Sequence, residues 1–232
     1  MNDTRPVGLF EAIYSTRALR RLRPEPVPDE VLFQLIDAAI RAPSGQNAQD
    51  WRFVLITDSD LKRRMQSWTE GGWAQYEARF GDAAQIAALP KPQRLSLRSV
   101  GYLAQHLGEA PVIVAVCGKR GRHSTPGGST FPAVQNLLLA ARALGLGASI
   151  FNFPFSHYDE LAEALAIPDN NQIYCLIPLG YPLDKQGPVG RKPVKRVAFW
   201  NRWEQPWAFA DRQPDEGWQE KWTGQHTGSK EA

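Results

Sequence analysis

The spacing of hydrophobic residues predicts alternating helices and strands along most of the chain. Apolar positions three and four residues apart predict a helix that starts at Asp29, as its N-cap, and ends near Arg41. Further helices are predicted over residues 9–14, 58–68, 93–107, 130–144 and 156–166, and strands over 51–57, 111–117, 148–153 and 173–180. Because strands and helices alternate without strict βαβ repetition, the pattern indicates an α+β or α/β single domain.

Polar residues and glycines predict where several of these helices begin and end. Asp58 is a predicted N-cap, and Ser156 with Asp159 resembles a capping box. Gly145 is the predicted C′ residue that ends the long helix before it. The segment 68–92 has a mixed pattern, since glycines and prolines interrupt its helical stretches.

Composition narrows the class of protein. Of 232 residues, 43% are hydrophobic and 22% charged, which is ordinary for a globular protein. The net charge of +3 is too small to indicate a nucleic-acid partner by itself. Cys117 and Cys175 do not make a disulfide scaffold. The start of the chain has no apolar signal region, and no apolar run reaches bilayer length, so we expect a soluble, cytoplasmic protein without a membrane partner.

Familiar catalytic and nucleotide motifs are absent from the sequence. There is no Walker A sequence and no Gly-x-Ser-x-Gly elbow. Gly145-Leu146-Gly147 lacks the third glycine of a dinucleotide-binding fingerprint. The four histidines are scattered, so no metal site is expected.

Three polar sets remain as candidates for binding. Arg17, Arg20 and Arg21 would suit a phosphate, because guanidinium groups form forked hydrogen bonds, or they are a solvated basic face. Residues 44–49 offer the mixture of donors and acceptors that a flavin needs, or they form an ordinary turn. Before Pro193, an Arg-Lys pair indicates either a phosphate contact or a surface turn.

Taken together, these segments resemble the nitroreductase family of FMN enzymes. The order and spacing of the matching pieces extend over residues 9–200, whereas 67–98 and the tail do not match. The resemblance therefore implies an FMN domain over 9–200 with a lid insertion at 68–98, and a C-terminal extension over 201–232. The matching pieces are 16–22, 24–28, 42–51, 133–141, 144–147, 167–169, 179–182 and 191–193.

The resemblance implies an α+β fold with a central, mostly antiparallel sheet flanked by helices. It also implies a homodimer of the domain-swapped type, with FMN at the subunit interface. Arg17 and Arg20 would hold the phosphate or ribityl oxygens, and backbone near Gly147 and Ala148 would approach the reactive edge of the ring. The implied cofactor-binding residues are Arg17, Ala18, Arg20, Arg191 and Lys192, with Gly147 and Ala148, and from the other subunit Pro43, Ser44, Gly45, Asn47 and Gln49.

Three residues depart from the family pattern. Ala18 stands where serine is frequent, which removes one hydroxyl contact. Leu22 stands where an aromatic residue is common, and Asp50 replaces a proline before Trp51. None of these changes removes an arginine.

The implied activity is NAD(P)H-dependent reduction of a small planar acceptor, such as a nitroaromatic, quinone or enone, by a ping-pong mechanism. NADH and NADPH both remain open as donors. Alternatives within the superfamily are reductive dehalogenation and oxidative fragmentation of the flavin. A remote alternative is a non-enzymatic nucleic-acid module that uses the basic stretches 17–23 and 119–123. Aromatic residues between 68 and 80 would stack on substrate or pack an interface.

Overall fold

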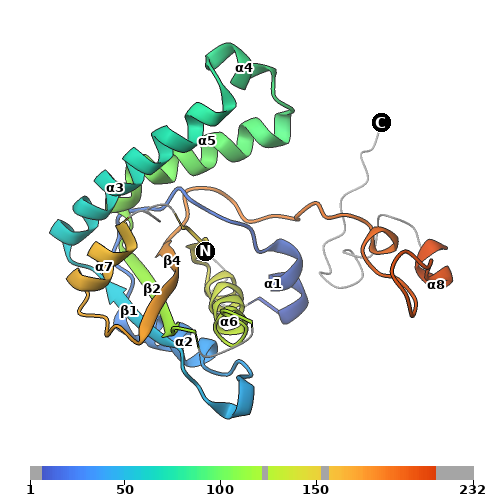
Figure 1. Cartoon of the computed structure of the whole chain (residues 1–232), viewed down its shortest axis with the longest axis horizontal. Coiled ribbons are helices and arrows are strands. Elements are labelled where there is room, and N and C mark those ends of the chain that lie inside the picture. The colour runs from blue at the N-terminus through green and yellow to red at the C-terminus, as the bar shows by residue number, and fades with distance from the viewer. Residues whose placement is uncertain (1–6, 122–124, 153–156, 213–232) are drawn as a thin grey trace.

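A computed structural model describes residues 7–121, 125–152 and 157–212 of the chain (Figure 1). Within these residues the centre is a four-stranded antiparallel sheet in the order β1-β2-β4-β3. Its strands are β1 (Arg52–Ile56), β2 (Val112–Lys119), β3 (Gly147–Ala148) and β4 (Asn171–Gly180). The predicted α+β architecture, an antiparallel sheet flanked by helices, is confirmed.

Helices lie on both faces of this sheet (Figure 1). The first two, α1 and α2, precede β1, whereas α3, α4 and α5 all lie between β1 and β2. The described helices are α1 (Leu9–Ser15), α2 (Asp29–Ala39), α3 (Ser59–Glu77), α4 (Ala83–Ala88), α5 (Lys91–His106), α6 (Thr130–Ala143), α7 (Tyr158–Ala164) and α8 (Ala208–Asp211).

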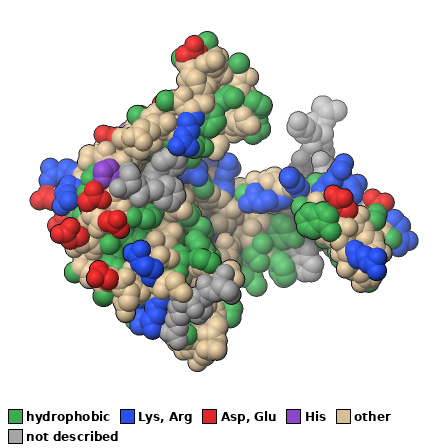
Figure 2. All heavy atoms as spheres, viewed as in Figure 1, with side chains coloured by type: hydrophobic (Ala, Val, Ile, Leu, Met, Phe, Trp, Pro, Cys, Tyr) green, Lys and Arg blue, Asp and Glu red, His purple; other side chains and the backbone are tan. Residues whose placement is uncertain are grey.

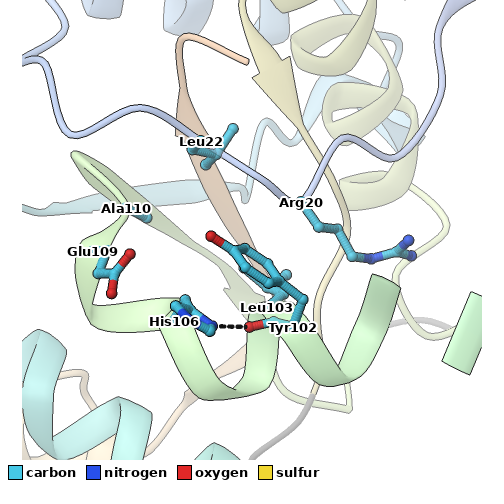
Figure 3. Close-up of a pocket in the computed structure, with 7 residues that line it drawn as sticks. All are labelled: Arg20, Leu22, Tyr102, Leu103, His106, Glu109 and Ala110. Atoms are coloured by element: carbon cyan, nitrogen blue, oxygen red, sulfur yellow. Dashed lines mark hydrogen bonds between the residues drawn. The ribbon is translucent and has the colours of Figure 1, made fainter. Parts of the chain in front are cut away.

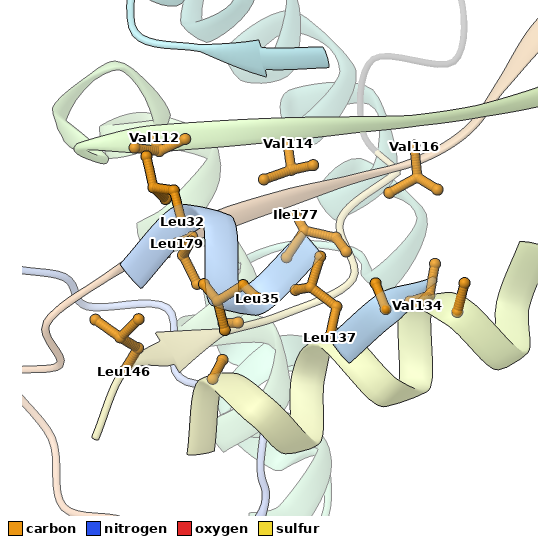
Figure 4. Close-up of a cluster of buried hydrophobic side chains, with 14 of the residues drawn as sticks. Leu32, Leu35, Val112, Val114, Val116, Val134, Leu137, Leu146, Ile177 and Leu179 are labelled. Carbon is orange, nitrogen blue, oxygen red and sulfur yellow. The ribbon is translucent and has the colours of Figure 1, made fainter. Parts of the chain in front are cut away.

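One face of the sheet packs against α2 and α6. Val112, Val114 and Val116 project from alternate positions of β2 into this layer, as the pleat of a strand requires (Figure 4). They meet Leu35 of α2 and Leu137 of α6, which are 1% and 0% exposed. The layer forms the larger of the two described hydrophobic clusters and fixes α6 against the sheet.

The opposite face packs against α3, α5 and α7. Ile113 and Ala115, the residues between those valines, enter a second cluster. Met65, Leu103 and Leu161 reach the same cluster from the three helices. Because both faces are covered, β2 is buried along nearly its whole length, and its sequence is a continuous apolar run instead of an alternating one.

The helices α3, α4 and α5 form an arm that extends from the sheet, with α4 at its far end (Figure 1). The sequence predicted that α3 ends near Trp68, but it continues through Gly71 and Gly72 to Glu77. Trp73 explains the difference, since it is 4% exposed and packs against α5 where residue 101 is glycine. A Cβ on Gly101 would lie 2.8 Å from Cζ2 of Trp73. Tertiary packing therefore outweighs the low helix propensity of the glycines.

The predicted helix ends are correct at two places and wrong at one. Asp58 caps α3, and its side chain accepts a 2.7 Å hydrogen bond from Leu61 N. Gly145 follows α6 with φ +77°, and its N–H donates to Arg142 O. The prediction of Asp29 as an N-cap is wrong: Pro28 is the N-cap, and Asp29 lies in the first turn, where its charge favours the helix dipole.

Some of the predicted elements extend into residues that the structure does not describe. Regular strand geometry covers only Gly147–Ala148, and an isolated bridge joins Phe151 to Leu176, whereas residue 153 lies outside the described part. Helix α7 has His157 as its N-cap; Ser156 of the predicted capping box lies outside. Part of the basic stretch 119–123 and of the extension 201–232 lies outside as well.

Gly145 and Gly71 provide a matched test of backbone strain. An added Cβ would meet nothing within 4 Å at either position, so only the backbone conformation distinguishes them. Gly145→Ala places a side chain at positive φ and should lower the free energy of unfolding by about 1 kcal/mol. Gly71→Ala, within α3, should raise it by roughly 0.5–1 kcal/mol. Denaturant unfolding measures both, and equal effects would contradict this explanation.

Candidate functional site

The arginine segment, residues 16–23, is held by pairing with the chain that leaves β4. Leu22 and Pro182 form an antiparallel bridge. Arg23 N donates to Tyr181 O at 2.7 Å, and Leu183 N donates to Arg21 O at 2.9 Å. The segment is therefore fixed beside the sheet by main-chain hydrogen bonds, although its sequence has no strand pattern.

Gly147 lies directly against this segment. A Cβ at Gly147 would lie 3.1 Å from Leu22 Cδ2 and Pro182 Cβ, and 3.2 Å from Leu19 Cβ. Close packing against Leu19, Leu22 and Pro182 therefore leaves little room for a side chain at this position. The contact brings Ala148, the next residue of β3, to the same edge of the molecule.

The two arginines predicted to bind phosphate differ in their surroundings. Arg17 is exposed, as is Ala18, whereas Arg20 is partly buried. Arg20 Nη1 donates to Ser99 Oγ of α5 at 3.1 Å. Its Nε is buried and has no hydrogen-bond partner among the described residues. Burial lowers the pKa of Arg20, because a desolvated cation is less stable than one in water.

The strap, residues 181–200, carries the remaining basic pair past the arginine segment. Val189 N donates to Tyr14 O at 3.3 Å, which places the strap beside the end of α1, three residues before Arg17. Arg191 and Lys192 follow on the strap, and both are exposed. Figure 2 shows Lys and Arg side chains gathered along this extended part of the chain.

The polar loop, residues 42–51, is fixed by its own side chains and by the start of α6. Gly45 N donates to Ser129 Oγ at 3.1 Å, and Gln49 N donates to Ser44 Oγ at 3.1 Å. Gln49 Nε2 also donates to Asn47 Oδ1 at 3.0 Å. These bonds hold a compact turn around the 3-10 helix η1 (Gly45–Asn47).

The backbone of the polar loop is strained. Gln46, Asn47 and Gln49 have φ of +53°, +52° and +51°, in the left-handed region. For residues other than glycine, such conformations cost of order 1–3 kcal/mol each and concentrate at functional sites. Pro43 and Asn47 are exposed, so the loop presents polar groups outward.

Helix α6 separates the two halves of the predicted site. The polar loop bonds to Ser129, just before α6, whereas Gly147 follows its other end. Fourteen helical residues span about 20 Å. Arg17, Ala18 and Arg20 thus lie in the segment that packs against Gly147 through Leu19 and Leu22, and Arg191 and Lys192 lie on the strap that bonds to Tyr14. The polar-loop residues lie at the other end of α6: Pro43, Ser44, Gly45, Asn47 and Gln49.

A small hollow lies beside Arg20 (Figure 3). It is lined by Arg20, Leu22, Tyr102, Leu103, His106, Glu109 and Ala110. The rings of Tyr102 and His106 stack at 4.0 Å, and His106 Nδ1 lies 2.7 Å from Tyr102 O. The Arg21 guanidinium lies over the Tyr102 ring at 5.7 Å. With a volume of about 10 Å³, the hollow holds no more than a water molecule, so it is not a flavin pocket.

Other reactive groups do not form a site in the described part of the chain. Cys117 and Cys175 are buried on neighbouring strands, and burial raises their pKa values to about 11 and about 12. These thiols are therefore poor nucleophiles at neutral pH. Among the described residues, no group of three His, Cys, Asp or Glu side chains is placed to hold a metal. None of the described helices combines the length and apolarity that crossing a bilayer requires.

Sequence reasoning missed Ser99 and Ser129. Ser99 contacts an arginine 79 residues away, and Ser129 contacts a backbone amide 84 residues away. No local pattern distinguishes either serine from a surface residue. For Ser129, the one local signal is its place before α6, but its hydroxyl accepts from Gly45 and does not cap the helix.

Two curated proteins show what the sequence is similar to. The NADH dehydrogenase of Thermus thermophilus is 30% identical over 220 residues, which cover 86% of this chain and 100% of that protein. Iodotyrosine deiodinase 1 of Rattus norvegicus is 30% identical over 183 residues. That match covers 75% of this chain but 61% of the deiodinase, which is the longer protein.

A solved structure agrees with these relatives. Oxidized iodotyrosine deiodinase bound to FMN and 3-iodo-L-tyrosine superposes with a TM-score of 0.67 at 25% identity, over 84% of this chain and 100% of that chain. In addition, residues 13–181 match the model of the Nitroreductase family. The chain therefore belongs to the Nitroreductase family, as its motifs predicted.

Proposed function

We propose that this protein is an FMN-dependent oxidoreductase that uses NADH or NADPH to reduce a small planar acceptor by a ping-pong mechanism. Nitroaromatics, quinones and enones are the acceptor classes. The observation that carries the proposal is the meeting of the arginine segment with β3, beside the strap that carries Arg191. This arrangement offers cations that suit the FMN phosphate and main-chain groups that suit the edge of the flavin ring.

The residues present fit FMN. Arg17, Arg191 and Lys192 are exposed cations, and guanidinium groups bind phosphate through forked hydrogen bonds. Arg20 is a partly buried cation whose Nε has no partner among the described residues, so an anionic ligand would stabilise it. Ala18 offers no hydroxyl, so within residues 16–23 the phosphate contact falls to the arginines.

When bound, FMN supplies the electron-transfer chemistry between the nicotinamide and the acceptor. The chain itself binds and orients. Gly147 and Ala148 place backbone at one edge of the site, and the charge of Arg20 favours a cofactor state with more negative charge. No side-chain nucleophile is required, which agrees with the buried thiols of Cys117 and Cys175. These unpaired thiols also fit the cytoplasm that we propose as its location.

The site is completed by a second copy of the chain. Because α6 separates the polar loop from the arginine segment, we assign the polar loop of each site to the other subunit. Exposed apolar residues support a homodimer: Leu9 and Ile13 on α1 are 65% and 44% exposed, and Trp203 beyond the strap is 82% exposed. Such surfaces are typical of interfaces. In this proposal the described part of the extension, residues 201–212, lies against the partner.

The arm supplies the lid of the site. It includes most of the predicted insertion 68–98, and α5 contacts both Arg20 and Arg21 through Ser99 and Tyr102. Several arm aromatics are engaged in packing: Trp73 is buried, and Trp68 stacks on His157 at 5.3 Å. Packing, rather than substrate stacking, accounts for these two tryptophans.

The first test is FMN binding by arginine variants. Arg17→Gln, Arg20→Gln and Arg191→Gln should each weaken FMN binding about tenfold or more, because a hydrogen bond to a charged group contributes about 1.5–3 kcal/mol. Arg63→Gln is the matched control, since Arg63 is an exposed arginine on α3 that pairs with Asp60. Titration of FMN fluorescence measures the dissociation constants. A wild-type protein that does not bind FMN would refute the proposal.

The shared site predicts complementation between two defective subunits. Arg17→Gln damages the phosphate end, and Gly45→Asp adds a carboxylate to the polar loop at a position where a Cβ meets only Ser129 Oγ at 3.9 Å. Each variant alone should bind FMN weakly. Heterodimers of the two should contain one intact site and recover one tightly bound FMN per dimer. If purified heterodimers recover none, the loop does not act across subunits.

A second candidate function is reductive dehalogenation. The similarity to iodotyrosine deiodinase, in sequence and in fold, specifically favours it. Incubation with NAD(P)H and a panel of nitroaromatics, quinones and 3-iodotyrosine distinguishes the two. We expect NAD(P)H oxidation with the planar acceptors and no release of iodide. A parallel incubation uses dithionite as the reductant in place of NAD(P)H. Iodide release in that incubation, without turnover of the other acceptors, would favour the second candidate.

A further inference from the structure

One face of α5 contacts the arginine segment at two points. Ser99 Oγ accepts a 3.1 Å hydrogen bond from Arg20 Nη1. Tyr102 lies three residues further along α5, and its ring lies under the Arg21 guanidinium at 5.7 Å. Residues three apart on a helix share a face. The arm is thus attached to the arginine segment by side chains that the resemblance did not assign to any role.

The bond from Ser99 determines how the Arg20 fork is fixed. Arg20 is partly buried, and this burial lowers its pKa because it removes water from around the charged group. A guanidinium offers five donors in a rigid plane, so one bond at Nη1 restricts the whole group. Arg20 Nε is buried and has no hydrogen-bond partner among the described residues, so among these the guanidinium is held by Ser99.

We propose that Ser99 is a positioning residue that holds the Arg20 guanidinium toward FMN and thereby raises the reduction potential of the bound cofactor. The proposal rests on the proposed function, since it requires FMN beside Arg20. Ser99 acts through Arg20 and needs no contact with FMN itself.

Arg17 and Arg20 differ in exposure, and this difference makes the reduction potential of bound FMN the best readout of the role of Ser99. Arg17 is exposed, so water and salt screen its charge, and it contributes to phosphate affinity alone. Arg20 is desolvated, so its field is less screened and extends further. Reduced FMN carries more negative charge near its ring than oxidised FMN. A fixed cation at Arg20 therefore stabilises the reduced state more than the oxidised state.

The same bond links the cofactor to the arm. Ser99 lies on α5, and Gly101, two residues further, packs against Trp73 of α3. Ser99 therefore joins Arg20 to the arm through α5, the helix that packs against α3.

The experiment compares Ser99→Ala, Ser99→Thr and Ser96→Ala in the full-length protein. Ser96 is the control, because it lies on the same helix and is exposed. Dissociation constants are measured for oxidised and for reduced FMN, and the midpoint potential is measured with reference dyes. Ser99→Ala should bind oxidised FMN within about twofold of wild type and reduced FMN about fivefold more weakly, as the loss of one hydrogen bond predicts. Its potential should fall accordingly, whereas Ser99→Thr and Ser96→Ala should match wild type.

An Arg20→Gln background shows whether Ser99 acts through the arginine. There, Ser99→Ala should cause no further change in potential, because coupled residues are not additive. Thermal unfolding of each variant monitors the fold. Equal weakening of both redox states by Ser99→Ala, or an unchanged potential with FMN bound, would overturn the positioning role and leave the proposed function standing. A wild-type protein that binds no FMN would overturn both.

Discussion

The pairing of residues 21–23 with 181–183 is the contact on which the candidate site depends. It attaches an arginine-rich segment, which has no strand pattern of its own, to the edge of a sheet whose strands come from distant parts of the chain. Glycine at position 147 favours the attachment, because a Cβ there would lie 3.1 Å from Leu22 Cδ2 and Pro182 Cβ, closer than most such contacts. An arginine-rich segment thereby acquires a defined position, which a specific ligand site needs.

The length of α6 sets the second constraint. It is packed against the sheet through residues such as Leu137, so its two ends cannot approach each other. The strained polar loop at one end and the arginine segment at the other must serve different places on the surface of one chain. In the proposed homodimer, a symmetric pair of chains would meet this constraint, since each chain would offer one end of α6 to each of two sites.

Much of the fold could be predicted from the sequence where local pattern and tertiary structure agree. Helix α6 with Gly145 as its C′ residue, the buried strand β2 and the Asp58 cap follow from periodicity and capping chemistry. The continuation of α3 beyond Trp68 could not be predicted, because its passage through Gly71 depends on Trp73 meeting Gly101.

In the candidate site, too, some residues could be predicted from the sequence and others could not. The order of family motifs pointed to the arginines and the polar loop as candidates. Its supporting residues were not predictable, because Ser99 and Ser129 act on groups 79 and 84 residues away and have no distinguishing neighbours in sequence. The motifs also could not show that Arg20 is desolvated while Arg17 is exposed, since burial depends on how α5 packs.

The central claim is that FMN binds between the arginine segment of one chain and the polar loop of another. Hydrogen exchange of the full-length protein with and without FMN tests this most directly. We predict slower exchange of backbone amides in both regions, 16–23 and 44–49, when FMN is added. Protection confined to one of these regions, or located elsewhere in the chain, would contradict the account.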